Sequence, residues 1–546
     1  MAFDTGEVGE LRGRLSRNHE GVGAGRVEGV HCDVGHNGQP SSTALFAVQD
    51  QDAHPRGEHR RCEKIEPMTA HFTRQHRIAV LGGGPGGYEA ALAGAQLGAE
   101  VTLIERQGVG GSAVLTDVVP SKTLIATAEA AGAIRGAGDL GVQFFARGES
   151  GRAVKPEVAV NLAQVNKRLL RLAQEQSDDM REQLVTAGVR IIAGEGRLDG
   201  PTRIVVATGH GTKRTDFDQC DADTVIVGVG ASPRELASAQ PDGERILTWT
   251  QLYSLREVPD HLIVVGSGVT GAEFASAYRA LGAEVTLISS RDQVLPGEDA
   301  DAAHLIETVF RRNGMTLLAT SRADSVVNTG DGVRVTLSNG TVIDGSHCLM
   351  AVGSIANTAG IGLEDAGVQL TESGHIAVNR VARTSIPSVY AVGDCSDSLP
   401  LASVAAMQGR TAVYHAMGDA VSPIRLRNVT SNIFTAPEIA TVGFSQKQIE
   451  GGETRGIVHK LMLETNPRAK MQGITDGFIK LFAAKTSGTV IGGVVVAPRA
   501  SELILPIALA IEHRLTVDQL AGAYSVYPSL SGGITDAARA MHVPRE

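Results

Sequence analysis

The eight residues LGAEVTLI occur twice in the chain, at 97–104 and again at 281–288. Each copy closes a longer segment of the same order: a short apolar run, glycines spaced as G-x-G-x-x-G, an alanine-rich stretch and a second apolar run. This order is typical of a strand, a tight turn, a helix and a second strand that together bind a dinucleotide. The sequence therefore predicts an α/β fold with two Rossmann-like domains and two bound dinucleotides.

Each glycine of the two turns has a distinct predicted task. The first permits the tight turn, the second lets the backbone approach a pyrophosphate, and the third lets the helix pack closely on the strand. The positions are Gly82, Gly84 and Gly87 in the first unit and Gly266, Gly268 and Gly271 in the second.

The residue that follows the repeated octapeptide differs between the two units. Glu105 closes the first unit, where a carboxylate binds ribose hydroxyls and repels a 2′-phosphate, as suits FAD or NAD. The second unit continues with Ser289, Ser290 and Arg291, which offer hydroxyl groups and a cation to a 2′-phosphate. NADPH is therefore expected there alongside NADH, and the alternative is that Arg291 points into solvent.

A later segment, TSIPSVYAVGDCSD, indicates which unit holds a flavin. It predicts a buried strand followed by Gly393 and Asp394, and LPLASVAAMQGR predicts a helix beginning near Ala402. An aspartate in this place can bind a ribityl hydroxyl, and the helix N-terminus can face the electron-rich edge of an isoalloxazine.

Six motifs in one order resemble those of the flavoprotein disulfide reductases, which include lipoamide dehydrogenase and glutathione reductase. They are GGGPGGYEA, GG…VPSK, GVGASPR, GSGVTGAE, YAVGDC and FTAPEIATVG. The resemblance runs from about residue 77 to the C-terminus. It is greatest to actinobacterial, lipoamide-dehydrogenase-like NAD(P)H quinone reductases without the redox-active cysteines. It implies FAD on the first unit, NADPH or NADH on the second, and a homodimer. It also implies cofactor contacts at Gly111, Gly230 and Gly353.

The resemblance and the motif order imply a layout of five segments. Residues 1–67 lack a sustained apolar period, and we expect them to be disordered or to precede a true start at Met68. The expected folded segments are 75–240 (FAD, first part), 241–355 (NAD(P)), 356–426 (FAD, second part) and 427–546 (α+β dimerisation domain).

Two departures from the family pattern bear on chemistry. GGSAVLTDVVPSK stands where lipoamide dehydrogenase has GGTCLNVGCIPSK, so Ala113 and Val118 replace both cysteines of the disulfide relay. YPSLSG stands where the family has a His-Pro-Thr-x-x-Glu segment, so Tyr527 replaces the histidine base and Gly532 its orienting glutamate. A tyrosine is a poor base at neutral pH. Tyr527 is expected either to contact an acceptor across the dimer or to be a packing residue.

Hydride transfer is expected to survive these losses. Lys122 of VPSK and Glu273 of GSGVTGAE match the family's lysine and glutamate beside the flavin, where a cation stabilises the reduced ring. A flavin without a disulfide must pass its electrons to an acceptor that diffuses to it. The sequence thus predicts an FAD-dependent NAD(P)H:quinone oxidoreductase. The alternatives are a soluble pyridine nucleotide transhydrogenase and a non-enzymatic flavoprotein for assembly or redox sensing.

Composition narrows the partners and the compartment. With 50 basic and 60 acidic residues the formal charge is −10, which disfavours nucleic acid as a partner. The five cysteines form no secreted disulfide framework and no metal site, so we expect no metal and a cytoplasmic location. No apolar run is long enough to span a bilayer. Peripheral contact with a membrane that holds a lipid quinone stays open.

Overall fold

The first parallel sheet contains both strands of the first predicted unit. In the computed structural model, β1 (Arg77–Leu81) pairs with β2 (Glu100–Glu105), and the strand order is β20-β9-β1-β2-β5, parallel throughout. The chain returns to this sheet late, because β20 (Val389–Ala391) pairs with β9 (Thr224–Val227). Strands buried on both faces need continuous apolar runs such as RIAVL, which explains the composition of β1.

The structure describes residues 75–145, 153–154, 156–208 and 216–542, and all of them belong to one folded unit, Phe72–Glu546. The predictions made for residues 1–67 lie outside the described residues. The predicted segment boundaries stay predictions.

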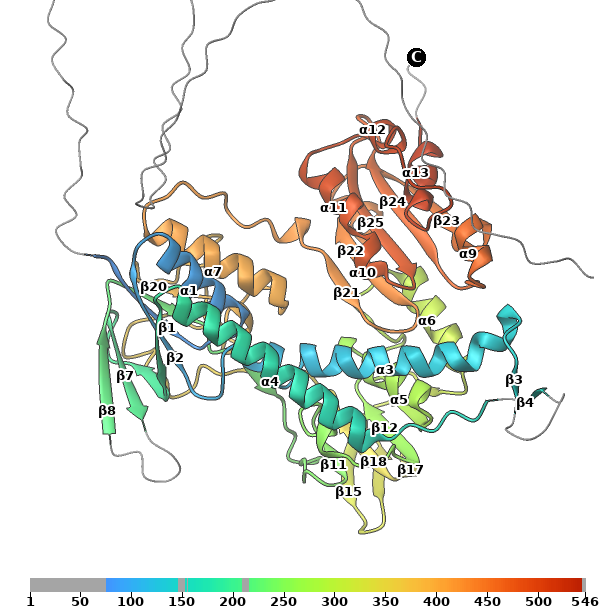
Figure 1. Ribbon diagram of the computed structural model, residues 1–546, viewed down its shortest axis with the longest axis horizontal. Coiled ribbons are helices and arrows are strands. Elements are labelled where there is room, and N and C mark those ends of the chain that lie inside the picture. The colour runs from blue at the N-terminus through green and yellow to red at the C-terminus, as the bar shows by residue number, and fades with distance from the viewer. Residues whose placement is uncertain (1–74, 146–152, 155, 209–215, 543–546) are drawn as a thin grey trace, which may run out of the picture. The chain divides into compact units, whose positions relative to one another are not determined.

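Helices pack around the first sheet. Helix α1 (Pro85–Gln96) lies beside α7 (Ala402–Ala416), as Figure 1 shows. The other helices and the last strand of this part are α2 (Gly111–Leu115), α3 (Val118–Gly136), η1 (Ala137–Leu140), α4 (Leu162–Thr186), β5 (Arg190–Ala193) and η3 (Gly393–Cys395). Two short strand pairs are β3 (Phe144–Phe145) with β4 (Ala153–Val154), and β10 (Ala231–Pro233) with β19 (Ser354–Ala356). An antiparallel sheet contains β6 (Glu195–Leu198), β7 (Arg203–Thr208) and β8 (Asp216–Asp221).

The second unit repeats the first. Strand β12 (His261–Val265), helix α5 (Val269–Leu281) and β13 (Glu284–Ile288) follow in sequence, in a parallel sheet ordered β11-β18-β12-β13-β14. The remaining elements are β11 (Ile246–Leu247), η2 (Leu252–Ser254), α6 (Ala300–Arg312), β14 (Thr316–Leu318), β18 (His347–Met350) and the antiparallel β15 (Ala323–Asn328), β16 (Val333–Leu337) and β17 (Val342–Gly345).

The repeated octapeptide performs the same turn in both units. Leu97 follows the last turn of α1 and Leu281 ends α5, and the glycine after each adopts a left-handed conformation, with φ of 79° at Gly98 and 116° at Gly282. Such a glycine ends a helix without the steric cost that a side chain would bring. The following apolar residues then enter the parallel sheet, so LGAEVTLI encodes a helix end, a turn and a strand.

The C-terminal part is built on an antiparallel sheet ordered β21-β22-β25-β24-β23. One face of this sheet packs against helices α10 to α13, and the core between them includes Ile479, Leu481 and Val495. The elements are η4 (Leu426–Asn428), β21 (Ser431–Ile433), β22 (Glu438–Gly443), α8 (Gln446–Glu450), β23 (Gly456–Met462), η5 (Leu463–Thr465), α9 (Pro467–Met471), β24 (Phe478–Ala484), β25 (Val490–Ala497), α10 (Ala500–Leu503), α11 (Leu505–Glu512), α12 (Val517–Ala521) and α13 (Gly532–Arg539).

Candidate active site

The first glycine turn has the geometry of a pyrophosphate site. Gly82 has a φ of 98°, and a Cβ on Gly87 would lie 1.9 Å from the Gly82 carbonyl oxygen, so neither position accepts a side chain. Beside Gly84 there is open space, and no side chain caps the N-terminus of α1. The free N–H groups of that helix end can therefore bind an anionic group that approaches the backbone closely.

The second glycine turn repeats these features. Gly266 has a φ of 109°, a Cβ on Gly271 would lie 1.8 Å from its carbonyl oxygen, and the space beside Gly268 is open. The N-terminus of α5 likewise lacks a side-chain cap. Both predicted dinucleotide sites thus have a close helix–turn contact and an open approach.

Glu105 lies at the end of β2, and its carboxylate is held by the backbone. Oε2 accepts a hydrogen bond from Gly83 N at 2.6 Å, and Oε1 accepts one from Gln107 N at 2.7 Å. The same turn packs against Gly111, where a Cβ would lie 2.9 Å from the Cα of Gly84. The carboxylate is therefore fixed beside the first glycine turn, and its contact with a ribose stays a prediction.

Ser289 differs from our expectation for the second unit. Its side chain is 1% exposed, and its hydroxyl accepts a hydrogen bond from Ser267 Oγ at 2.7 Å and another from Arg291 N at 3.1 Å. The hydroxyl is thus used inside the protein, where it holds the loop after β13, and is not offered to a nucleotide. Ser290 and Arg291 are exposed on that loop.

The flavin motif forms a turn between β20 and α7. Gly393 has a φ of 76° and donates its N–H to Gln408 Oε1 at 2.8 Å. Burial raises the pKa of Asp394, and the electrostatic effect of His375 offsets part of this rise. Ala402 is the first residue of α7, whose N-terminus no side chain caps. Of the other predicted contacts, Gly230 and Gly353 have φ of 66° and 93° with open space beside them.

Lys122 and Glu273 meet although they lie 151 positions apart. Lys122 Nζ, from α3, donates to Glu273 Oε2, from α5, at 2.7 Å, while Phe434 N donates to Glu273 Oε1 at 2.9 Å. The Lys122 side chain is 27% exposed and that of Glu273 only 5%. Lys122 Nζ also lies 4.8 Å from the centre of the Phe434 ring. A buried carboxylate thus fixes the position of a cation that stays accessible.

A cleft of about 480 Å³ opens beside this pair. Lys122 and Glu129 line it from α3, and Phe434, Glu438 and Arg499 line it from the C-terminal part. Burial and the charge of Glu438 raise the pKa of Glu129, while Arg499 lowers it. The accessible side of Lys122 therefore faces a cleft with mixed charges.

Our sequence reasoning missed Asp117, which lies directly before α3 in the segment that replaces the family's disulfide. Burial raises its pKa to about 6, the charges of Glu273 and Asp394 add to the rise, and Lys122 opposes it. The charges that act on the Asp117 carboxyl thus belong to three predicted site residues, which lie on α3, α5 and η3. The signal in the sequence was the acid itself, in GGSAVLTDVVPSK, where the family pattern has a glycine.

Tyr527 lies between α12 and α13, and its side chain is 82% exposed. Among the described residues, its hydroxyl has no hydrogen-bond partner, and nothing joins it to Lys122 or Glu273 within one chain. Tyr524 and Val526 beside it are also exposed. A contact between Tyr527 and an acceptor across a dimer stays a prediction.

The described cysteines do not replace the missing disulfide. Cys220, Cys348 and Cys395 are unpaired, and the last two are buried. Burial raises the pKa of Cys395 to about 11 and that of Cys348 further. A thiol must lose its proton to act as a nucleophile, so these two buried thiols are inert at neutral pH.

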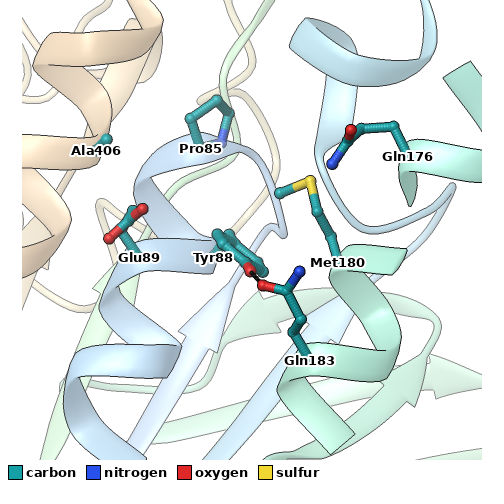
Figure 2. Close-up of a pocket in the computed structure, with 7 residues that line it drawn as sticks. All are labelled: Pro85, Tyr88, Glu89, Gln176, Met180, Gln183 and Ala406. Atoms are coloured by element: carbon teal, nitrogen blue, oxygen red, sulfur yellow. Dashed lines mark hydrogen bonds between the residues drawn. The ribbon is translucent and has the colours of Figure 1, made fainter. Parts of the chain in front are cut away.

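A smaller hollow of about 240 Å³ lies beside the first turn of α1 and holds none of the predicted site residues (Figure 2). Tyr88 donates its hydroxyl hydrogen to Gln183 Oε1 at 2.6 Å across this hollow.

No helix in the described ranges has the length and apolar character needed to cross a membrane.

Comparison with known proteins places these features in a family. Residues 76–409 match the model of the pyridine nucleotide-disulphide oxidoreductases, and residues 429–538 match the dimerisation domain of the same proteins. The chain is 52% identical over 472 residues to an NAD(P)H dehydrogenase (quinone) from Mycobacterium tuberculosis, with 85% of this chain and 94% of the relative covered. It is 30% identical to a dihydrolipoyl dehydrogenase from Chlorobaculum parvum, with 85% of this chain and 96% of that relative covered.

Solved structures of similar proteins have the same fold. A crystal structure of LpdA from Mycobacterium tuberculosis has a TM-score of 0.80 and 50% identity, and the match covers 86% of this chain and 100% of that one. The flavoprotein disulfide reductase RclA from Escherichia coli, at 20% identity and a TM-score of 0.73, shares the fold. The predicted fold class and family are confirmed, and the chain belongs to the pyridine nucleotide-disulphide oxidoreductase family.

Proposed function

We propose that this protein is an FAD-dependent NAD(P)H:quinone oxidoreductase. The observation that carries the proposal is that the Lys122–Glu273 pair is assembled while both cysteines of the family's relay are replaced, by Ala113 and Val118. The relative at 52% identity, named NAD(P)H dehydrogenase (quinone), supports the same activity.

The residues present fit two dinucleotides. A Cβ at Gly82 or Gly266 would collide with neighbouring backbone, and the helix ends beyond them are uncapped. FAD would be held by the first turn together with Glu105, Gly111, Gly230, Asp394 and the start of α7. The second turn, with Ser290, Arg291 and Gly353, would hold NADPH or NADH. Bound FAD would supply a two-electron carrier between the nicotinamide and the quinone.

The chain's own residues position and stabilise charge. Glu273, fixed by Phe434 N, holds the Lys122 ammonium group in one place, so no reorganisation is needed when negative charge develops beside it. Arg291, exposed after β13, offers a cation to a 2′-phosphate and so favours NADPH.

We further propose that the protein acts in the cytoplasm as a homodimer. The matched dimerisation domain and the exposed apolar side chains of Leu505, Tyr524 and Val526 support the dimer. The unpaired buried thiols agree with a reducing compartment.

The test is oxidation of NADPH by purified protein with menadione as the acceptor, followed by absorbance. We expect turnover well above the rate without quinone. A transhydrogenase would instead transfer hydride from NADPH to thio-NAD with little quinone turnover, and a non-enzymatic flavoprotein would bind FAD without being reduced by either nicotinamide. Brisk turnover of dihydrolipoamide would contradict the proposal, because no disulfide relay is present to carry it.

A further inference from the structure

We propose that Ser267 and Ser289 form a buried pair that makes the second unit selective for a nucleotide with a 2′-phosphate. The pair fixes the backbone of Arg291 and occupies the place that an acid would need. Both serines are positioning residues, because their hydroxyl groups bond to each other and act through the loop that carries Arg291. The inference rests on the proposed function, since it concerns the nicotinamide nucleotide that the second unit would hold.

The two units differ at two matched positions that contact each other. Gly83 and Ser267 are the middle residues of the two glycine turns, and Glu105 and Ser289 follow the two copies of LGAEVTLI. In the first unit Gly83 N donates to Glu105 Oε2 at 2.6 Å. In the second unit Ser267 Oγ donates to Ser289 Oγ at 2.7 Å. Each unit thus joins its turn to the end of its second strand, by a carboxylate in one and by two hydroxyl groups in the other.

The glycine in the middle of the first turn makes room for the acid. A Cβ added to Gly83 would lie 3.1 Å from Glu105 Oε2 and 3.3 Å from its Cγ, closer than carbon atoms usually pack. Ser267 has such a Cβ and carries a hydroxyl group beyond it. The pair is closely enclosed, with Ser267 6% exposed and Ser289 1% exposed. An acid in place of Ser289 would therefore collide with Ser267 if it lay as Glu105 does, so the second turn excludes the group that repels a 2′-phosphate.

The Ser289 hydroxyl also holds the backbone of Arg291. Its oxygen accepts a hydrogen bond from Arg291 N at 3.1 Å, and its hydrogen can go to Arg291 O at 3.1 Å or Gln293 O at 3.3 Å. Thr320 N donates to Arg291 O at 2.8 Å from the other side. The Arg291 side chain itself is exposed. A cation on a fixed backbone loses less conformational freedom when it binds a phosphate, so its affinity rises.

Ser267 binds the same loop a second time. Leu295 N donates to Ser267 O at 2.9 Å, and Leu295 has a φ of 54°, a left-handed conformation that a side chain disfavours. Both ends of the loop 289–295 are therefore bonded to one residue, which lies between Gly266 and Gly268. The turn that would receive the pyrophosphate and the loop that carries Arg291 thus form one preorganised structure.

The first test measures binding and not turnover. Dissociation constants of NADP⁺ and NAD⁺ are measured by titration calorimetry on the oxidised holoenzyme, in which FAD fills the first unit. We expect the wild type to bind NADP⁺ more tightly than NAD⁺. Ser267→Ala keeps the Cβ and removes the hydrogen bond, so it should weaken NADP⁺ about three- to tenfold and change NAD⁺ by less than about twofold.

Ser177→Ala is the matched control. It also removes a buried serine hydroxyl, 3% exposed, which donates to Val109 O at 2.6 Å in the first unit. It should leave the ratio of the two dissociation constants at the wild-type value.

An exchange of the matched residues tests the exclusion of the acid. The double replacement Ser267→Gly with Ser289→Glu recreates the pair of the first unit, and it should turn the preference to NAD⁺ by at least about tenfold. Ser289→Glu alone should weaken NADP⁺ without strengthening NAD⁺, because Ser267 blocks the acid. Flavin content and thermal unfolding show whether each variant is folded, and Ser267→Ala tests the pair without a new charge.

The outcomes separate this inference from the proposed function. A Ser267→Ala variant that binds both nucleotides like the wild type overturns the positioning role, as does a wild type that binds NAD⁺ as tightly as NADP⁺. A Ser289→Glu variant that gains as much NAD⁺ affinity as the double variant overturns the exclusion of the acid. A holoenzyme that binds NADP⁺ as expected but reduces no menadione overturns the proposed function alone, and one that binds neither nucleotide overturns both.

Discussion

The replacement Lys122→Met tests the pair on which hydride transfer is proposed to depend. It removes the cation that lies 2.7 Å from Glu273 Oε2, and it leaves a carboxylate whose side chain is only 5% exposed. Removing one partner of a buried ion pair costs about 3–5 kcal/mol. Because Lys122 is itself about a quarter exposed and Phe434 N still donates to Glu273, we expect a smaller loss, about 2–3 kcal/mol.

The same replacement should slow the reduction of the flavin. Removal of one preorganised group that stabilises developing charge typically costs roughly 100- to 1,000-fold in rate. The assay is anaerobic stopped-flow mixing of holoenzyme with excess NADPH, followed through the loss of flavin absorbance. Chemical denaturation of the same preparations gives the free energy of unfolding.

Two further variants separate charge from fold. Lys167→Met removes an exposed lysine from α4 and should change neither quantity. The double replacement Lys122→Met with Glu273→Met removes both charges, so it should recover much of the stability and none of the rate. If Lys122→Met unfolds like the wild type and is reduced by NADPH within about threefold of its rate, the reasoning about this pair is refuted.

Other parts of the structure give independent tests. Arg291→Ala should raise the KM for NADPH about tenfold and leave that for NADH nearly unchanged, since only NADPH carries the 2′-phosphate; an equal rise for both would contradict this in steady-state assays. Lys480→Met should destabilise the fold by about 3–5 kcal/mol in denaturant titrations, because Lys480 Nζ lies 2.7 Å from the buried Asp299 carboxylate. Gly87→Ala should yield protein without flavin, because a Cβ there would lie 1.9 Å from a carbonyl oxygen of the same turn, and full flavin content would show the turn to be more tolerant than we infer. Because burial raises the pKa of Asp117 to about 6, its folded form binds the proton more tightly than its unfolded form, so stability should fall by up to about 3 kcal/mol as pH rises from about 4 to 6; Asp117→Asn should lack this fall in thermal denaturation.

The sequence by itself determined the two dinucleotide units. Their signals are local: a helix end, a left-handed glycine and a buried strand follow one another within LGAEVTLI, and the turn glycines recur at fixed spacing. The absence of the two family cysteines is also a property of the sequence, and it fixed the expectation of an acceptor other than a dithiol. Such features depend on neighbours within about ten residues, so they can be recognised without the fold.

Only the tertiary structure decided how distant side chains combine. It brings Lys122 to Glu273, lets charges on three elements act on Asp117, and turns the Ser289 hydroxyl inward to Ser267. Burial and electrostatic coupling depend on which elements pack together, and this information is spread over residues that lie 22 positions apart for Ser267 and Ser289 and 151 apart for Lys122 and Glu273. The acidity of Asp117 is therefore a property of the folded chain, because burial and charges on separate segments raise the pKa of one carboxyl group.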